Sequence, residues 1–199
     1  MMNGRNKSFN EKELVNRSQN GDTTAFAMLV KEYSSGILTF INRMILSRED
    51  AEDISQVVFI KAYKGLSLFK GNSSFKTWLY TIAKNESYSF MKKKNPQKVS
   101  LDEKADLMDS ISIQYPETDA ENALVKEEFI KTVRKGLEQL PLKYNTIIQL
   151  FYLKEFKYEE IAEILKIPMG TVKTHLFRAV KMLRKEVLHN LEEKVYNEM

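Results

Sequence analysis

The chain has 199 residues, of which 43% are hydrophobic, and a formal net charge of +4, so it suits one folded domain or two small ones and leans mildly towards a polyanionic partner. It contains no cysteine, which excludes a disulfide, a thiol nucleophile and a thiolate metal site. No apolar run approaches the roughly 20 residues of a membrane helix, and the N-terminus lacks the apolar core of a signal peptide. We therefore expect a soluble, cytoplasmic protein.

The first half of the chain predicts helices in succession. Only seven Gly and four Pro occur in the chain, and apolar residues recur at helical spacing, so the predicted fold class is all-α. Asp22 is expected to cap a helix that carries Phe26 and Leu29 on its apolar face. Ser47 and Asp50 stand in capping-box spacing at the start of the next helix, and Gly65 is expected to end it.

Residues 69–94, FKGNSSFKTWLYTIAKNESYSFMKKK, interleave aromatic rings with positive charge. This stretch holds the only Trp, six Lys and a single acid, Glu86. With about 100° of rotation per residue, its helix has two distinct faces. One is apolar and contains Phe75, Leu79, Ile82, Ala83 and Phe90. The other, which we call the ring-and-amide stripe, contains Trp78, Thr81, Asn85, Tyr88 and Lys92.

The ring-and-amide stripe is typical of a surface that binds unpaired bases. Stacking of a base on an aromatic ring contributes roughly 1–3 kcal/mol, and an amide can hydrogen-bond a base edge. Lys84, Lys93 and Lys94 lie beside the stripe and, together with Lys92 within it, suit phosphate contacts. The alternatives are that these lysines form a solvated face, and that Trp78, Phe69 and Phe75 are core anchors between helices.

A break follows at Asn95-Pro96. From there to Asn122 the chain is acidic and shows no sustained period, with seven acids against one Lys over residues 100–122, which indicates a linker. We therefore expect two small helical domains, residues 8–95 and 123–192, joined by a flexible acidic linker over residues 96–122.

The second domain contains a segment, residues 158–184, with the layout of a helix-turn-helix. Pro168 prevents the first helix from continuing through the turn, and Thr171 is the expected cap of the second helix. Lys166 stands where such turns often have Gly. A positive φ at Lys166 would cost of order 1 kcal/mol.

The second helix of this segment divides into an apolar and a basic face. The apolar face contains Val172, Leu176, Ala179, Val180, Leu183 and Val187. The basic face contains Lys173, Thr174, Phe177, Arg178, Lys181, Arg184 and Lys185. Because no acid interrupts residues 166–185, this face suits a recognition helix that contacts phosphates and base edges of duplex DNA. A merely solvated basic face is the alternative.

Five blocks in this order resemble one family. They are GDTTAF at 21–26, EDAEDISQVVFIKAY at 49–63, FKGNSSFKTWLYTIAKN at 69–85, LPLKYNTIIQL at 140–150, and the helix-turn-helix. With them the chain resembles bacterial RNA polymerase sigma factors of the extracytoplasmic-function (ECF) group. The resemblance implies a sigma-two-like and a sigma-four-like domain that recruit core RNA polymerase to promoter DNA. It also implies a linker that threads the polymerase's RNA channel, although a solubilising spacer is the alternative.

The resemblance assigns roles to residues of this chain. It implies that the first domain melts the downstream promoter element by capturing a flipped base, with a pocket formed by the loop 69–75 and Asn85. The expected downstream contacts are Phe69, Asn72, Phe75, Trp78, Asn85, Tyr88 and Lys92. The expected upstream contacts are Lys173, Thr174, Phe177, Arg178 and Lys181. The expected polymerase contacts are Asp53, Gln56, Phe59 and Ile60.

The chain departs from the family pattern at three positions. Val57 replaces a usual acid, which suggests a more apolar polymerase contact, and Ser89 replaces a frequent Asp. Glu86 falls on the apolar face, where an unpaired buried carboxylate would be costly, so it must reach a cation or the surface. An anti-sigma factor is expected as a further partner from the resemblance alone.

Two other classes of protein remain as alternatives. An enzyme is disfavoured, because the only histidines, His175 and His189, lie roughly 21 Å apart along one helix and no Gly-rich phosphate loop exists. We expect no catalytic residue, no metal and no cofactor. A helix-turn-helix regulator with a sensing or dimerising N-terminal domain would explain the second domain, but it leaves the ring-and-amide stripe unexplained.

Overall fold

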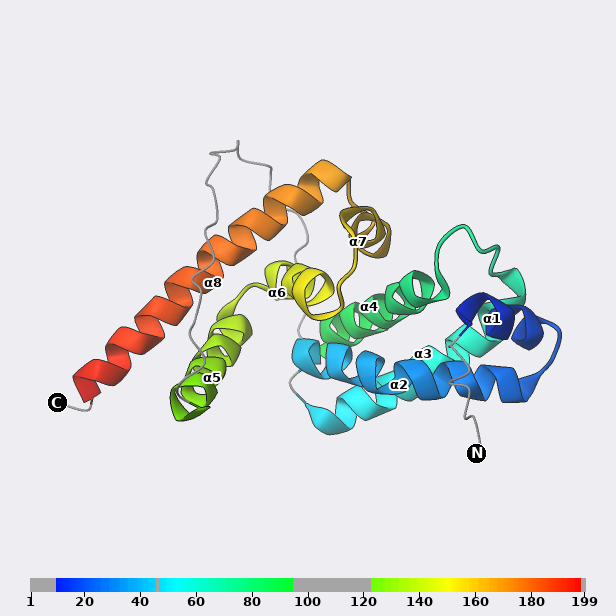
Figure 1. Ribbon diagram of the computed structural model, residues 1–199, viewed down its shortest axis with the longest axis horizontal. Helices are drawn as coiled ribbons and strands as arrows, with labels where there is room; N and C mark the ends of the chain where they lie inside the picture. The colour runs from blue at the N-terminus through cyan, green and yellow to red at the C-terminus, as the bar shows by residue number, and fades with distance from the viewer. Residues whose placement is uncertain (1–9, 46, 95–122, 198–199) are drawn as a thin grey trace, which may run out of the picture. The chain divides into compact units, whose positions relative to one another are not determined.

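The computed structural model describes residues 10–45, 47–94 and 123–197, and no strand occurs among them. The described helices form two compact units, one made of residues 10–94 and the other of most of residues 123–197 (Figure 1). The all-α prediction with two helical domains is therefore confirmed, while the expected linker, 96–122, lies outside the described residues. Over these ranges no helix is both long and apolar enough to cross a membrane.

The N-terminal unit is a helical bundle with α2 at its centre. Its elements are α1 (Glu11–Gln19), α2 (Thr23–Ile45), α3 (Arg48–Gly65), the short 3₁₀ helix η1 (Leu66–Leu68) and α4 (Phe75–Lys94). Helix α2 packs against α1, α3 and α4. Its apolar side chains Leu29, Ile37 and Phe40 are fully buried, and Phe40 contacts the ring of Tyr80 on α4 at 5.2 Å between centroids.

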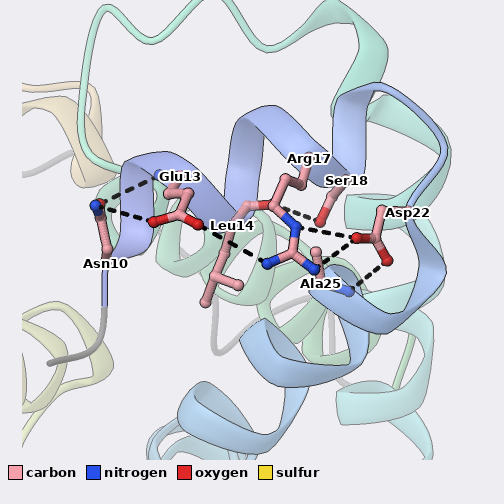
Figure 2. A network of polar contacts seen from close by, with 7 residues as sticks. All are labelled: Asn10, Glu13, Leu14, Arg17, Ser18, Asp22 and Ala25. Carbon is pink, nitrogen blue, oxygen red and sulfur yellow. Dashed lines mark hydrogen bonds and ion pairs between the residues drawn. The ribbon is translucent and has the colours of Figure 1, made fainter. Parts of the chain in front are cut away.

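Side-chain caps begin α2 and α3 as the sequence predicts. Asp22 accepts a hydrogen bond from the N–H of Ala25 at 3.0 Å and a second from Arg17 at 2.7 Å (Figure 2). The Ala25 N–H, followed by the Arg17 guanidinium, lowers the pKa of Asp22. Ser47 accepts from the N–H of Asp50 at 3.4 Å. Helix α3 ends at Gly65, so both predicted caps and this helix end are confirmed.

The C-terminal unit is organised around one long helix. Its elements are α5 (Ala123–Gln139), α6 (Leu142–Ile148), the π-helical turn η3 (Gln149–Leu153), α7 (Tyr158–Leu165) and α8 (Met169–Asn197). Helix α8 packs against α5 and α6. A Cβ atom at Gly136 of α5 would lie 3.1 Å from Leu183 and 3.3 Å from Val187 of α8. Gly136 therefore permits the close approach of these two helices.

The turn between α7 and α8 settles the conformation of Lys166 and corrects the start of α8. Lys166 has a φ of 56°, the left-handed conformation that Gly would adopt without strain, and the N–H of Ile167 bonds to the Ala162 carbonyl at 3.1 Å. The expected cap at Thr171 is wrong. Helix α8 begins at Met169, because the carbonyl of Pro168 already accepts the first helical hydrogen bond, from Val172 at 3.1 Å.

Candidate nucleic-acid interface

Three aromatic rings gather where the loop after η1 meets the start of α4. The ring centroids of Phe69 and Trp78 are 5.0 Å apart, and those of Phe75 and Trp78 are 5.7 Å apart. Phe75 is 2% exposed and also contacts Tyr33 of α2, so its ring belongs to the core. Phe69 and Trp78 are half-buried, so part of each ring remains accessible to a ligand.

The loop before α4 has a defined shape. Ser74 accepts a hydrogen bond from the N–H of Thr77 at 3.0 Å, which caps the first turn of α4. Gly71 has a φ of 70°, a left-handed conformation that residues with a Cβ rarely adopt. Asn72 follows this turn and is exposed, where its amide is available to a ligand.

The ring-and-amide stripe of α4 is only partly exposed. Trp78 and Asn85 are half-buried and Lys92 is exposed. Tyr88 is 9% exposed, and the ammonium of Lys84 lies 5.5 Å from its ring centroid. Lys84 is also 9% exposed, which removes it from the set of available phosphate contacts. The accessible part of the stripe therefore runs from Trp78 through Asn85 to Lys92.

Two residues of α1 contact the loop, and sequence reasoning did not identify either of them. The side-chain amide of Gln19 donates to the carbonyls of Leu66 and Phe69, and Glu11 accepts from the N–H of Phe75. These contacts join residues 47 to 64 positions apart. No local spacing or periodicity predicts pairs at such separations, so the single sequence held no signal for them.

Helix α3 presents an exposed apolar strip beside polar groups. Val57 is 40% exposed and Ile60 is 54% exposed, and residues three apart share one face of a helix. Asp53 and Gln56 are also exposed, and Phe59 is half-buried. All the residues predicted to contact polymerase are thus at least partly accessible. The replacement of an acid by Val57 makes this face more apolar, as expected.

The basic face of α8 is accessible, and its predicted apolar face is buried over the first turns, whereas Val180, Leu183 and Val187 are half-buried. Val172 and Ala179 are fully buried, and Leu176 is 6% exposed. On the opposite face Thr174, Phe177 and Arg178 are half-buried, and the exposed members are Lys173, Lys181, Arg184 and Lys185. This face presents cations with a partly accessible aromatic ring between them.

Two polar side chains of this face already have contacts within the unit. The Thr174 hydroxyl donates to the Gly170 carbonyl at 3.0 Å, which leaves its oxygen able to accept from a base edge. The ammonium of Lys173 lies 5.7 Å from the ring centroid of Tyr158 on α7. These contacts hold the two side chains at the start of α8.

His175 lies at the edge of the basic face without adding to its charge. Its ring meets that of Tyr144 edge-on, with 5.7 Å between centroids. Burial, followed by the nearby charges of Lys143 and Arg178, lowers the pKa of His175. His175 is therefore neutral near pH 7, and the positive charge of the face comes from Lys and Arg. Within the described ranges no group of His, Asp and Glu side chains is arranged to hold a metal ion.

The two units match two families in the order of the chain. Residues 29–97 match Sigma-70 region 2, and residues 130–183 match Sigma-70, region 4. The first match includes α3, the loop and α4. The second includes most of α5 and the helix-turn-helix. The accessible rings and the basic helix thus fall in different family regions.

Curated relatives match both units together. The chain is 37% identical over 181 residues to the ECF RNA polymerase sigma factor SigW of Bacillus subtilis, covering 88% of this chain and 96% of the relative. It is 36% identical over 177 residues to the ECF RNA polymerase sigma-E factor of Escherichia coli K12, covering 87% of this chain and 92% of the relative. The similarity therefore extends over nearly the full length of these relatives.

Solved structures share the fold. The sigma factor RpoE, in a co-crystal structure with the anti-sigma factor NepR from Bartonella quintana, superposes with a TM-score of 0.61 at 26% identity and covers 81% of this chain and 96% of its own. CnrH, in complex with the cytosolic domain of CnrY, gives a TM-score of 0.64 at 17% identity and covers 92% and 97%.

The helical units and their matches define a DNA-binding protein of the sigma-70 class. The chain belongs to the ECF group of RNA polymerase sigma factors, which direct promoter-specific transcription initiation. Members of this class are non-catalytic initiation factors. The resemblance seen in the sequence is confirmed, and the reading as a regulator with a sensing domain is not favoured.

Proposed function

We propose that the two units divide promoter recognition between them. The N-terminal unit, residues 8–95, opens the downstream promoter element, and the C-terminal unit, residues 123–192, reads the upstream element as duplex. The observation that carries this division is the partly accessible Phe69–Trp78 ring pair in one unit, set against the exposed cationic face of α8 in the other.

In the N-terminal unit, a flipped base is captured by those predicted downstream contacts that are accessible. Phe69 and Trp78 offer ring faces, the amides of Asn72 and Asn85 hydrogen-bond base edges, and Lys92 neutralises a phosphate. Stacking contributes roughly 1–3 kcal/mol per base against an unstacking cost of about a few kcal/mol. Two or three such contacts are therefore sufficient to hold a melted strand without ATP.

The buried residues among the predicted downstream contacts have a supporting role in this proposal. The buried ring of Phe75 contacts the ring of Trp78, with 5.7 Å between their centroids. The ring of Tyr88 contacts the ammonium of Lys84, which is also on α4. Phe75 is only 2% exposed and Tyr88 only 9%, which favours a role in shaping the pocket for the flipped base. Direct stacking on a base falls to Phe69 and Trp78.

In the C-terminal unit, the start of α8 enters the major groove. Lys173, Arg178 and Lys181 contact phosphates or guanine edges, because Lys and Arg present donors to both. Thr174 contacts a base edge, and Phe177 contacts a thymine methyl group. The absence of acids over residues 166–185 supports this role, since no carboxylate opposes the approach of the DNA backbone.

Helix α3 docks on core RNA polymerase in this proposal. Ile60 and Phe59 supply apolar contacts, and Asp53 and Gln56 supply polar ones at the edge of the surface. The exposure of Ile60, at 54%, supports the assignment, because a large apolar side chain left in water gains by burial against a partner.

An anti-sigma factor is the proposed regulatory partner, and the cytoplasm is the proposed site of action. Structural similarity to the RpoE protein solved with its anti-sigma factor NepR supports such a partner for this chain. Residues 96–122 join the units as an acidic linker, which raises the effective concentration of the second DNA contact once the first has formed.

In vitro transcription with purified core polymerase tests the proposed function. A library of random promoter fragments is transcribed with core polymerase alone, with the protein alone, with both together, and with both plus a second sigma factor. We expect defined transcripts from both together without the second sigma factor, and none from either alone. Transcripts that require an additional sigma factor would show instead that the chain acts as a regulator.

A further inference from the structure

The loop between η1 and α4 is attached to α1 at both of its ends. At its start, the Gln19 amide nitrogen donates to the carbonyl oxygen of Leu66 at 3.0 Å and to that of Phe69 at 2.8 Å. At its end, a carboxylate oxygen of Glu11 accepts the N–H of Phe75 at 3.0 Å. Residues 70–74 lie between these two attachments, so α1 sets the span that the loop must cross.

Helix α1 is itself firmly placed. Its side chains Leu14 and Val15 are buried, and α1 packs against α2. The guanidinium of Arg17 lies 2.7 Å from the carboxylate of Asp22, which caps α2 (Figure 2). The second carboxylate oxygen of Glu11 accepts the hydroxyl of Tyr33 on α2. The groups that bond the loop are therefore fixed to the core of the unit.

The Gln19 contact acts on the backbone that carries the half-buried Phe69 ring. Fixing the carbonyl of Phe69 restricts the backbone from which the Phe69 ring reaches Trp78, 5.0 Å away. An amide NH2 group has two donors, so one side chain satisfies both carbonyls. Gln19 is exposed, so this contact contributes little burial to the core, and positioning the loop is the role that its geometry favours.

We propose that Gln19 is a positioning residue for base capture. Together with Glu11, it holds loop 69–75 in the shape that receives the flipped base, although neither residue touches DNA. The inference rests on the proposed function of that loop. It predicts that a substitution on α1 alters binding of a melted strand without altering binding of duplex DNA.

The matched pair Gln19→Leu and Asn20→Leu tests this inference. Both changes remove an amide from neighbouring positions of the same helix end, but the Asn20 side chain bonds only to Asn16 among the described hydrogen bonds. The full-length chain is assembled with core polymerase. The probe is a short single-stranded DNA that the wild-type holoenzyme selects from a random pool, after removal of the sequences that core polymerase alone retains.

We expect Gln19→Leu to weaken binding of this probe by about 5- to 30-fold, because two hydrogen bonds that order the loop are lost. Asn20→Leu should stay within about twofold of wild type. Hydrogen exchange of residues 66–75 should accelerate in Gln19→Leu alone. Fluorescence of Trp78, the only Trp in the chain, should shift in the same variant, since its ring contacts Phe69.

The possible outcomes distinguish failure of the positioning role of Gln19 from failure of base capture by the loop. If the wild-type holoenzyme selects a probe and Gln19→Leu binds it as Asn20→Leu does, the positioning role is wrong while base capture stands. If both variants lose affinity and thermal stability in parallel, Gln19 serves the fold alone and the inference is overturned. If the wild-type holoenzyme selects no single strand beyond core polymerase, base capture by the loop is itself refuted.

Discussion

The ammonium of Lys61 on α3 lies 2.6 Å from a carboxylate oxygen of Glu86 on α4. Glu86 occurs on the face of α4 that the sequence predicts to be apolar, and its side chain is 20% exposed. A carboxylate in such a place needs a partner, since desolvation of an unpaired charge is costly. The ion pair therefore explains how this departure from the family pattern is accommodated.

Replacing Lys61 tests this explanation. We expect Lys61→Met to lower the free energy of unfolding by about 0.5–1.5 kcal/mol, because it leaves the partly buried Glu86 carboxylate without its cation. The double variant Lys61→Met with Glu86→Leu should recover most of the loss, since it removes both charges. Urea denaturation measures both values. A double variant less stable than the single one would contradict the explanation.

Lys166 offers a stabilising substitution. Its φ of 56° is strained for a residue with a Cβ, so Lys166→Gly should raise the free energy of unfolding by roughly 0.5–1 kcal/mol. Lys166→Ala keeps the Cβ and should show no such gain, which makes it the matched control. Thermal denaturation compares the two. Equal stability of the Gly and Ala variants would show that the left-handed conformation carries no cost.

Acidification should weaken the Asp22 cap of α2 and the ion pair of Asp50 with Lys94 at the start of α3. The pKa of Asp22 is lowered by the N–H of Ala25 and by Arg17, and that of Asp50 by Lys94 and then by Ser47, from an ordinary value of 3.8. A folded-state pKa below the unfolded one stabilises the fold above pH 3.8, and this contribution is lost as the pH falls through the lowered pKa.

The variant Asp22→Asn isolates this contribution, because Asn retains an oxygen that caps the helix but carries no charge. We expect its melting temperature to lie below that of wild type near neutral pH and to converge with it as the pH falls below the ordinary Asp value. Melting curves across the acidic range measure the difference. A gap that does not change with pH would contradict the assigned cause.

Periodicity and capping rules predicted the parts of the fold that depend on neighbouring residues. Asp22 and Ser47 cap the expected helices, and Val172 and Ala179 on the predicted apolar face of α8 are buried. Periodicity also grouped Tyr88 with Trp78, yet Tyr88 is 9% exposed while Trp78 is half-buried. A helical wheel gives the direction of a side chain but not which neighbouring helix covers it.

Contacts between distant segments were not predictable from one sequence. The partner of Glu86 is 25 positions away, and the contacts of Glu11 and Gln19 with the loop span still more. Such pairs depend on how α1, α3 and α4 pack, which the spacing of residues along each helix does not determine. The accessible rings of the candidate site were predicted, whereas the groups that hold their loop were not.

The apolar strip of α3 gives a prediction about polymerase binding. Ile60→Glu should weaken binding to core polymerase by about tenfold or more, since it places an unpaired charge in the contact. Met28→Glu is the control, because Met28 on α2 is similarly exposed, at 47%, and lies outside the predicted set. Competition for core polymerase against another sigma factor gives the affinities. Equal losses in the two variants would point to general misfolding or a different docking surface.

Permanganate footprinting of an open promoter complex, with duplex protection measured on the same DNA, tests the division of labour most directly. We expect Trp78→Ala and Asn85→Ala to lose permanganate reactivity at the downstream element while protection of the upstream element persists. Lys173→Ala and Arg178→Ala should instead lose upstream protection with little effect on folding. Equal loss of both signals in all four variants, with normal folding, would contradict the account.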